Sequence, residues 1–425
     1  MRWTDVDMMY DIVVRFEHTW VYMAMLLFFA WYPVGTSLMW MFTALIYFVR
    51  REVNQDMSYY DIDEYPLVSV VIPAFNEGHN IVATIDGVLA LNYPNFEILV
   101  VDDNSTDDTF AKLMSYARDG RIRLVRKRRN EGKAMALNDA IPATSGDLLL
   151  VMDADAVPDP DILKYLVPHF KYPRVAAVTG NPRVVNRDSF LAKLQTIEFT
   201  SIISMLRRAQ RVWGRIVTMS GVVGLFRRSA LLDVGLYSPE MATEDIDLTW
   251  RLQLAHWDVR YEAHAVMWMN VPQSLNGLWH QRRRWALGLS QVLTRHAPEA
   301  LQWKNRRLWP VLIEACLSIS WAYIYVFLTI IWLTSYFVGY PPIGASPIPN
   351  LWGMLIGTTC LCQLGMGVLL DRRYDKNLGR YYIVAVFYPL VYWIMMSVIT
   401  VITSPKGANV NRKRERITQW KPVRE

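Results

Sequence analysis

Two carboxylates, Asp153 and Asp155, stand at the end of a short apolar run in the segment 147–153. The run predicts a buried strand, and side chains two positions apart at its end point to the same side. Because hard divalent cations prefer oxygen ligands, the pair is a candidate site for Mg²⁺ or Mn²⁺. A cation there could bridge a nucleotide diphosphate and neutralise the charge of a departing group. The alternative is a solvated turn, which is the usual role of an isolated Asp-x-Asp.

Two more strand-like segments, 70–77 and 100–109, also run into polar turns. Asp102 and Asp103 could accept hydrogen bonds from a uracil ring and a ribose. One residue of the second turn is expected to cap the next helix instead, and the candidates are Ser105, Thr106 and Asp107.

Gly132 and Lys133 stand at the start of a predicted helix. Backbone N–H groups at a helix start, together with one cation, suit an approaching phosphate. Such a pair is a weak signal in isolation, since Gly-Lys at a helix start is frequent.

Acidic residues open another predicted helix, which begins after Thr243. Thr243 is a natural N-cap, and the helix dipole stabilises acids such as Glu244 and Asp245 in the first turn. The same dipole keeps a carboxylate ionised, as a general base for a sugar hydroxyl must be. Ordinary helix-start acids are the competing interpretation.

The segment 274–295 has apolar residues at helical spacing, interrupted by arginines and two tryptophans. It predicts an amphipathic helix in a membrane interface, with headgroup-level anchors at Trp279, Trp285, Trp303 and Trp309. In its middle, Arg284 could contact a diphosphate, and the Trp285 indole offers a stacking face to a sugar. Contact with lipid headgroups is the better explanation for Arg282 and Arg283.

An α/β fold is predicted to position these groups. Short β-branched runs predict strands at 67–74, 96–102, 147–153 and 175–180, with helices near 79–90, 106–118 and 132–144. This alternation implies a mostly parallel sheet with helices on both faces. Ligands bind at the carboxyl ends of such strands, where Asn76, Asp103 and Asp153 are expected.

Apolar residues are concentrated in blocks, since the 425-residue chain is 52% hydrophobic and yet 20% charged. Segments 21–49, 310–338, 350–370 and 381–404 are long enough for membrane helices, and Pro389 predicts a kink or interruption in the last. Basic clusters flank these segments, which indicates topology signals and anionic lipid and argues against a nucleic-acid surface. Cys316, Cys360 and Cys362 fall inside apolar stretches without metal-ligand spacing.

The basic residues also predict topology. Arg50 and Arg51 place the segment 52–300 in the cytoplasm. Three further crossings would leave the basic tail, with Arg412 and Arg416, outside, against the positive-inside rule. Either the last segment is re-entrant or another is miscounted. No cleavable signal peptide is evident, because the first apolar run follows an acidic segment.

Five ordered motifs resemble the processive branch of family 2 glycosyltransferases: FNE (75–77), the aspartate pair ending at Asp103, DAD (153–155), TED (243–245) and QRRRW (281–285). The resemblance implies a GT-A catalytic domain between membrane helices and a UDP-sugar-dependent hexosyltransferase that inverts the anomeric carbon. It divides the chain into an N-terminal membrane segment (1–51), a cytoplasmic GT-A domain (52–272), interfacial helices (273–309), C-terminal membrane helices (310–404) and a basic tail (405–425).

The resemblance also implies roles for individual residues. Asp103 would hold the uracil, Asp153 would position the nucleotide-sugar, and Asp155 would ligate Mg²⁺ or Mn²⁺. Asp245, beside Glu244, would take the proton from the acceptor hydroxyl. Further nucleotide-sugar-binding residues would be Pro73, Asn76, Glu77 and Lys133. The acceptor and pyrophosphate side would be lined by Ser220, Gly221, Gln281, Arg284 and Trp285.

Within that branch the chain is similar to catalytic subunits of bacterial poly-β-1,6-N-acetylglucosamine synthases, in the segments 178–184, 201–214, 220–231 and 241–254. This implies polymerisation of N-acetylglucosamine (GlcNAc) from UDP-GlcNAc into a biofilm polysaccharide, coupled to export, in a multi-pass protein of the bacterial plasma membrane. Besides the lipid bilayer and the growing polysaccharide, a small accessory membrane subunit and cyclic di-GMP are candidate partners.

Several alternatives stay open on the residues alone. Cellulose, hyaluronan and chitin synthases share the reaction, and a non-processive transferase to a lipid carrier would share the first three motifs. An inactive membrane scaffold with a GT-A domain is disfavoured by the intact Asp153 and Asp245. If polymer leaves between the membrane helices, the aromatic residues that could line its path are Trp321, Tyr323 and Tyr325.

Overall fold

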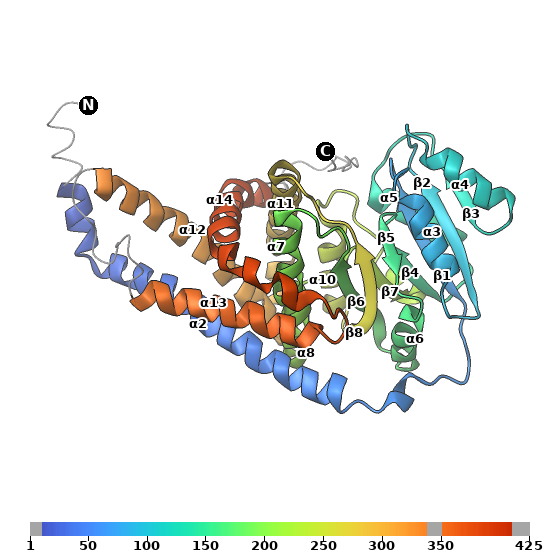
Figure 1. The fold of residues 1–425 in the computed structure, drawn as a ribbon, viewed down its shortest axis with the longest axis horizontal. Coiled ribbons are helices and arrows are strands. Elements are labelled where there is room, and N and C mark those ends of the chain that lie inside the picture. Colours follow the sequence, from blue (N-terminus) through green and yellow to red (C-terminus); the bar gives the residue numbers. More distant parts are fainter. Residues whose placement is uncertain (1–10, 338–350, 410–425) are drawn as a thin grey trace.

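The computed structural model describes residues 11–337 and 351–409. Within them an eight-stranded sheet has the order β3–β2–β1–β4–β7–β6–β8–β5 (Figure 1). The strands are β1 Val68–Ala74, β2 Phe96–Asp102, β3 Arg123–Arg126, β4 Leu148–Met152, β5 Ala156–Pro158, β6 Val175–Val184, β7 Val223–Arg227 and β8 Asp258–Met269. Parallel pairing joins β3, β2, β1 and β4, and β7 runs antiparallel to both β4 and β6. The predicted α/β fold with a mostly parallel sheet is confirmed.

Apolar side chains on both faces explain why the central strands are buried. In β1, Val70 and Ile72 join the core on one face of the sheet, and Val71 joins the core on the other. Each such side chain contributes about 1.5–3 kcal/mol through burial. The first face is covered by α3 Ile81–Leu89, α4 Thr109–Arg118 and α6 Ile162–Leu166. The second is covered by α5 Lys133–Ala140, α9 Arg228–Asp233 and α10 Glu244–Leu254.

The sequence did not predict β3, β5, β7 and β8. The edge strand β3 is mostly exposed, so it has no apolar run that would mark it. The strand β8 carries charged residues among apolar ones, and their partners lie both within β8 and on other elements. Glu262 of β8 accepts hydrogen bonds from His169 at 2.9 Å and His264 at 2.7 Å. Such a strand becomes recognisable only when its polar partners are known.

Among the described residues, three helices are long and apolar enough to cross a membrane: Trp20–Val53, Trp303–Phe337 and Gly353–Asp371. A fourth candidate is the pair Leu378–Phe387 and Val391–Ala408, whose two parts are bent by 64°. These spans agree with the predicted segments, and the bend falls at Pro389, where an interruption was expected. Arg412 and Arg416 of the predicted tail lie outside the described residues.

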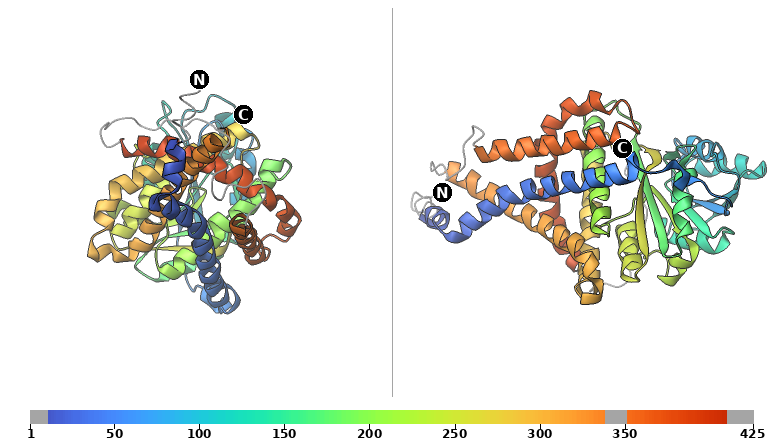
Figure 2. Two further views of the ribbon diagram at one scale, coloured as in Figure 1. Left: turned by 90° about the vertical axis from the view of Figure 1, so that its left-hand side faces the viewer. Right: turned by 90° about the horizontal axis from the view of Figure 1, so that it is seen from below.

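The apolar helices extend from one end of the molecule, and the sheet forms the other (Figures 1 and 2). The extended group contains α2 Trp20–Phe48, α12 Trp309–Phe337 and α13 Leu351–Asp371. Between this group and the sheet lie α7 Phe190–Glu198, η5 Phe199–Met205, α8 Leu206–Trp213 and α11 Leu275–Ala300. The last segments are η7 Leu378–Phe387, η8 Pro389–Trp393 and α14 Ile394–Ala408, and α14 packs along α11. The intermediate helices therefore connect the sheet with the candidate membrane helices.

Candidate active site

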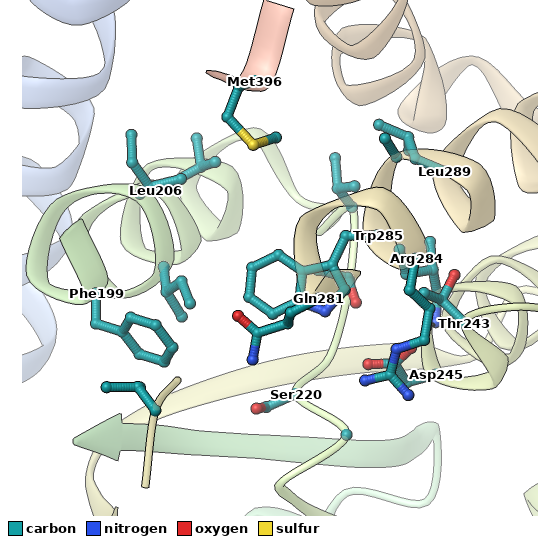
Figure 3. A pocket seen from close by; sticks show the side chains of 18 of the residues that line it. Phe199, Leu206, Ser220, Thr243, Asp245, Gln281, Arg284, Trp285, Leu289 and Met396 are labelled. Carbon is teal, nitrogen blue, oxygen red and sulfur yellow. Dashed lines mark hydrogen bonds between the residues drawn. The ribbon is translucent and has the colours of Figure 1, made fainter. Parts of the chain in front are cut away.

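A cavity of 1620 Å³ lies between the sheet, the starts of α5 and α10, α11 and the apolar helices. Most of the predicted site residues line it: Glu77, Lys133, Asp153, Asp155, Ser220, Gly221, Glu244, Asp245, Gln281, Arg284 and Trp285. Pro73, Asn76 and Asp103 are not among its lining residues. Figure 3 shows Gln281 and Trp285 from α11 above Ser220, with Arg284 pointing toward Asp245. Residues far apart in the sequence are thus brought together around one space.

Lys133 is the centre of a cation–carboxylate cluster on the sheet side of this cavity. Its Nζ donates to Asp153 Oδ1 at 2.6 Å and to the Gly221 carbonyl at 3.0 Å, and lies 3.5 Å from Glu244 Oε1. Asp153 follows β4, and Lys133 is the first residue of α5 after Gly132, which has a φ of 87° that favours glycine. The predicted helix start is confirmed, and its lysine reaches the end of the neighbouring strand.

Asp245 lies in the first turn of α10, where its Oδ1 accepts the Ile246 N–H at 2.9 Å. Burial, followed by the negative charge of Glu244, raises the pKa of Asp245 to about 6. Lys133 and Arg284 act in the opposite direction. Asp245 is thus much more basic than an ordinary helix-start acid, and its pKa is shifted in the direction opposite to that expected from the helix dipole.

Asp247, two residues further along α10, has the opposite environment. It accepts hydrogen bonds from Ser238 at 2.7 Å, Arg251 at 2.8 Å and His296 at 2.8 Å. These partners outweigh its burial and hold the pKa of Asp247 well below its usual range. Only one of the two carboxylates is therefore available to a ligand in the cavity.

Thr243 occupies the N-cap position of α10, as predicted, but its side chain makes no capping hydrogen bond. Its Oγ1 is buried and has no hydrogen-bond partner within the described part of the chain. A Cβ added at Gly288 would lie 1.8 Å from this oxygen. The close packing of α11 against the start of α10 explains the difference, because it fixes Thr243 toward α11 and the cavity.

Asp103 is fully buried behind the cavity. Its carboxylate accepts the N–H groups of Glu131 at 3.0 Å and Gly132 at 2.7 Å. It therefore holds the loop that presents Lys133. Burial raises the pKa of Asp103, and the two backbone N–H groups act against this rise.

Pro73 and Asn76 are the remaining predicted site residues. They and the turn before α4 lie at the carboxyl ends of β1 and β2. Pro73 is part of β1, and Asn76 has a φ of 54° and accepts the Thr106 N–H at 2.8 Å. The prediction that Ser105, Thr106 or Asp107 caps the next helix is wrong, because Asp108 is the N-cap residue of α4 and makes no side-chain capping hydrogen bond. Asp107, one position earlier, accepts the Thr109 N–H at 3.0 Å. Asn76 and Asp107 therefore organise the turns around this edge of the sheet.

On α11, Gln281 and Trp285 face the cavity, and Gln281 Oε1 is buried without a hydrogen-bond partner among the described residues. The prediction that Trp285 is a headgroup-level anchor is wrong, because its indole is part of the cavity wall. The prediction for Arg282 is also wrong. This side chain is 3% exposed and pairs with Glu198 of α7, so it is not available to lipid headgroups. Arg283 is exposed, which agrees with the predicted surface position.

Arg207 of α8 is a cation of the cavity wall that the sequence did not reveal. It is 6% exposed, and burial lowers its pKa to about 10, although Tyr261 and Asp245 favour the charged form. Its Nε donates to the Thr218 carbonyl at 3.3 Å, and NH1 has no partner among the described residues. The available signal was three arginines, Arg207, Arg208 and Arg211, among the apolar residues of the helical stretch 201–214.

Asp153 and Asp155 could hold a divalent cation. Within residues 11–337 and 351–409, no group of three or more His, Cys, Asp or Glu side chains could hold a metal ion alone. Mg²⁺ is commonly bound by one or two carboxylates together with substrate phosphate oxygens. The two aspartates on the wall of an open cavity fit that donor set, with the remaining ligands supplied by a diphosphate and water.

Comparisons with known proteins agree with this geometry. The family model described as glycosyl transferase family 2 matches residues 69–235. The poly-β-1,6-N-acetyl-D-glucosamine synthase of Staphylococcus epidermidis is 34% identical over 399 residues, covering 92% of this chain and 96% of the relative. The chain belongs to glycosyltransferase family 2. The synthase of the same name from Staphylococcus aureus strain COL matches with the same identity and coverage.

A solved mannosyltransferase from Pyrobaculum calidifontis, in complex with GDP-mannose and Mn²⁺, supports the fold of this family member. It is 21% identical, has a TM-score of 0.60, and the match covers 90% of this chain and 99% of the mannosyltransferase. At this identity the likeness establishes the GT-A fold together with the flanking helices, and it says nothing of the sugar. The predicted fold class and the prediction of a UDP-sugar glycosyltransferase are thus confirmed at the level of the family.

Proposed function

We propose that this enzyme polymerises GlcNAc from UDP-GlcNAc into β-1,6-linked poly-N-acetylglucosamine and passes the polymer into the membrane. The name and near-complete coverage of the staphylococcal relatives support the polymer. One observation carries the mechanism: the basic carboxylate Asp245 shares a cavity with a cation–carboxylate cluster, and that cavity continues between the apolar helices.

The donor is proposed to bind on the sheet side of the cavity. Lys133 and Arg284 supply positive charge for the diphosphate of UDP, and Asp153 keeps the Lys133 ammonium in place at 2.6 Å. Mg²⁺ or Mn²⁺, held by Asp153 and Asp155 with diphosphate oxygens, would neutralise charge on the leaving UDP. Asp103 acts indirectly, since it holds the loop of Gly132 and does not line the cavity. This replaces the expected direct contact between Asp103 and the uracil.

Asp245 is proposed to be the general base. It takes the proton of the acceptor hydroxyl, whose oxygen then forms a bond to the anomeric carbon of the donor sugar. The bond from that carbon to the diphosphate oxygen breaks, and UDP leaves with the electron pair, which inverts the anomeric centre. A pKa of about 6 leaves Asp245 ionised near neutral pH and basic enough for this transfer. Trp285 offers an aromatic face to the acceptor sugar.

The polymer is proposed to leave along the part of the cavity between the apolar helices. Tyr32 from α2, Glu314 and Trp321 from α12, and Trp393 from η8 line that part. Tyr323 and Tyr325 are not among the lining residues. The Tyr323 hydroxyl shares a hydrogen bond with Ser404 at 2.9 Å, and Tyr325 packs on Phe29. Of the three aromatic residues predicted to line the path of the polymer, Trp321 therefore remains in the proposal.

A re-entrant last segment is proposed to complete the topology. The 64° bend between its two parts and the packing of α14 along α11 support this arrangement. With α2, α12 and α13 crossing, the catalytic domain and the basic tail then lie on the same, cytoplasmic side of a bacterial plasma membrane, in line with the positive-inside rule. Labelling of an engineered cysteine in the tail of sealed inside-out vesicles tests this, and protection from the reagent would contradict it.

Purified full-length protein, incubated with individual UDP-sugars, tests the function. We expect release of UDP from UDP-GlcNAc, a long product, and loss of both after EDTA with recovery on Mn²⁺ or Mg²⁺. Turnover of UDP-glucose would indicate a cellulose-type synthase, and a product extended by one sugar would indicate a non-processive transferase. Activity of the chain alone, and its response to added cyclic di-GMP, decides whether an accessory subunit or this nucleotide is required.

A further inference from the structure

A buried ion pair joins α11 to α7 beside the aromatic wall of the cavity. Arg282 NH2 donates to Glu198 Oε2 at 2.6 Å, and the two side chains are 3% and 4% exposed. Removing two charges from water carries a large desolvation penalty, and such pairs are weak evidence for stability.

The same guanidinium lies against the aromatic residues of the cavity wall. It is 4.1 Å from the ring centroid of Trp285, one turn further along α11, and 5.5 Å from the ring of Tyr392 in η8. Tyr392 in turn stacks on Tyr388 with ring centroids 4.8 Å apart. The three aromatic residues line the cavity, whereas Arg282 and Glu198 do not. Arg282 thus contacts the aromatic wall from behind.

We propose that Arg282, anchored by Glu198, is a positioning residue that holds Trp285 and Tyr392 in place for the sugar units of the growing chain. A cation within about 6 Å of a ring centroid is attracted to the ring face, and this restricts ring rotation. The indole surface left open by Arg282 belongs to the cavity wall, where a sugar can stack. Because Tyr392 belongs to η8, the same cation connects the acceptor platform on α11 with the broken last membrane segment.

This inference rests on the proposed function, and it predicts different effects on binding of the donor and on binding of the acceptor. Lys133 and Asp153 of the donor side make no contact with Arg282, so donor binding should not depend on it. Loss of the cation should instead weaken binding of the acceptor end and shorten the product. A purely structural ion pair would lower the stability and leave this balance unchanged.

The test uses full-length protein in detergent, with UDP-GlcNAc as donor and β-1,6-linked GlcNAc oligosaccharides as added acceptor. For Arg282→Met we expect a KM for the oligosaccharide raised about tenfold, shorter polymer, and a KM for UDP-GlcNAc within about twofold of wild type. Arg282→Lys should recover part of the acceptor affinity. The double variant Arg282→Met/Glu198→Leu removes the isolated buried carboxylate, so it should recover thermal stability but not acceptor affinity.

Arg283→Met is the matched control, because Arg283 is the exposed neighbour of Arg282 on the same helix. If the double variant recovers the wild-type acceptor KM and product length, Arg282 is only a structural partner of Glu198 and the inference is overturned. An equal loss in Arg283→Met would overturn it as well, since general positive charge would then explain the effect. A wild-type chain that makes no polymer would contradict the proposed function itself.

Discussion

A catalytic and a structural cluster of basic and acidic side chains are built from similar groups in different surroundings. In the catalytic cluster the side chains of Lys133, Asp153 and Glu244 are 16%, 24% and 12% exposed. In a second cluster, here called the junction cluster, the side chains of Glu52, Arg183, Arg208 and Asp371 are at most 1% exposed. The catalytic cluster opens on a cavity, and the junction cluster is closed.

The junction cluster holds the ends of two apolar helices against the catalytic domain. Arg208 of α8 donates to Glu52, after α2, at 2.6 Å and to Asp371, the end of α13, at 2.8 Å. Arg183 of β6 also pairs with Asp371. In the closed junction cluster the charged side chains pair with one another, whereas Lys133 and Asp153 can take up a ligand at the cavity. Access to a cavity, more than residue type, therefore distinguishes a catalytic site from a structural contact between elements.

The largest expected effect is a loss of activity, without a loss of stability, on substitution of Asp245 in the cavity. Asp245→Asn should lower the rate of UDP release about 10²- to 10⁴-fold, because a general base typically contributes that much. Thermal stability should stay near that of wild type, since the amide oxygen of an asparagine can still accept the hydrogen bond from the Ile246 N–H. Full polymerising activity in this variant would show that Asp245 is not the base.

A substitution in the junction cluster should lower the stability of the protein. Arg208→Met leaves Glu52 buried without its main partner, so we expect a loss of about 3–5 kcal/mol of stability. The thermal midpoint of the solubilised protein measures this loss, and Arg372→Met, at an exposed neighbouring arginine, is the control. An unchanged midpoint in Arg208→Met would mean that the junction cluster does not hold the helices.

The pH dependence of kcat/KM tests the role of Asp245 beside the catalytic cluster. The raised pKa of Asp245 means that its proton is retained up to about pH 6. A base must be deprotonated, so kcat/KM should fall about tenfold per pH unit below about 6 and level off above it. Glu244→Gln removes a charge that raises this pKa, and should move the midpoint to lower pH. A flat profile between about pH 5 and 7 would contradict this assignment.

The smallest expected effect lies at the edge of the junction cluster. The Tyr374 hydroxyl donates to Glu52 Oε2 at 2.6 Å, and this oxygen also accepts from Arg208 at 2.9 Å. Tyr374→Phe should therefore lower stability by only about 1.5 kcal/mol and leave turnover unchanged. Loss of activity at constant stability would indicate that the junction cluster also influences catalysis.

Local patterns in the sequence were enough to predict several parts of this protein. Buried strands are short apolar runs with polar residues at their ends, so the central strands and the position of Asp153 were predictable. The membrane candidates depend on length and hydropathy, which are also local. The order of the motifs identified the family, because five signals in sequence are far more specific than any one of them.

Which charged groups face the cavity and which are closed off depends on tertiary packing. Glu198 and Arg282 are 84 residues apart in the sequence, and their contact turned an expected lipid-facing arginine into a buried one. Asp245 and Asp247 share one helix turn. Asp247 accepts hydrogen bonds from Ser238, Arg251 and His296, whereas Asp245 lines the cavity. Exposure, and with it the pKa and the role of a charged group, depends on the elements packed around it, and local sequence patterns do not contain that information.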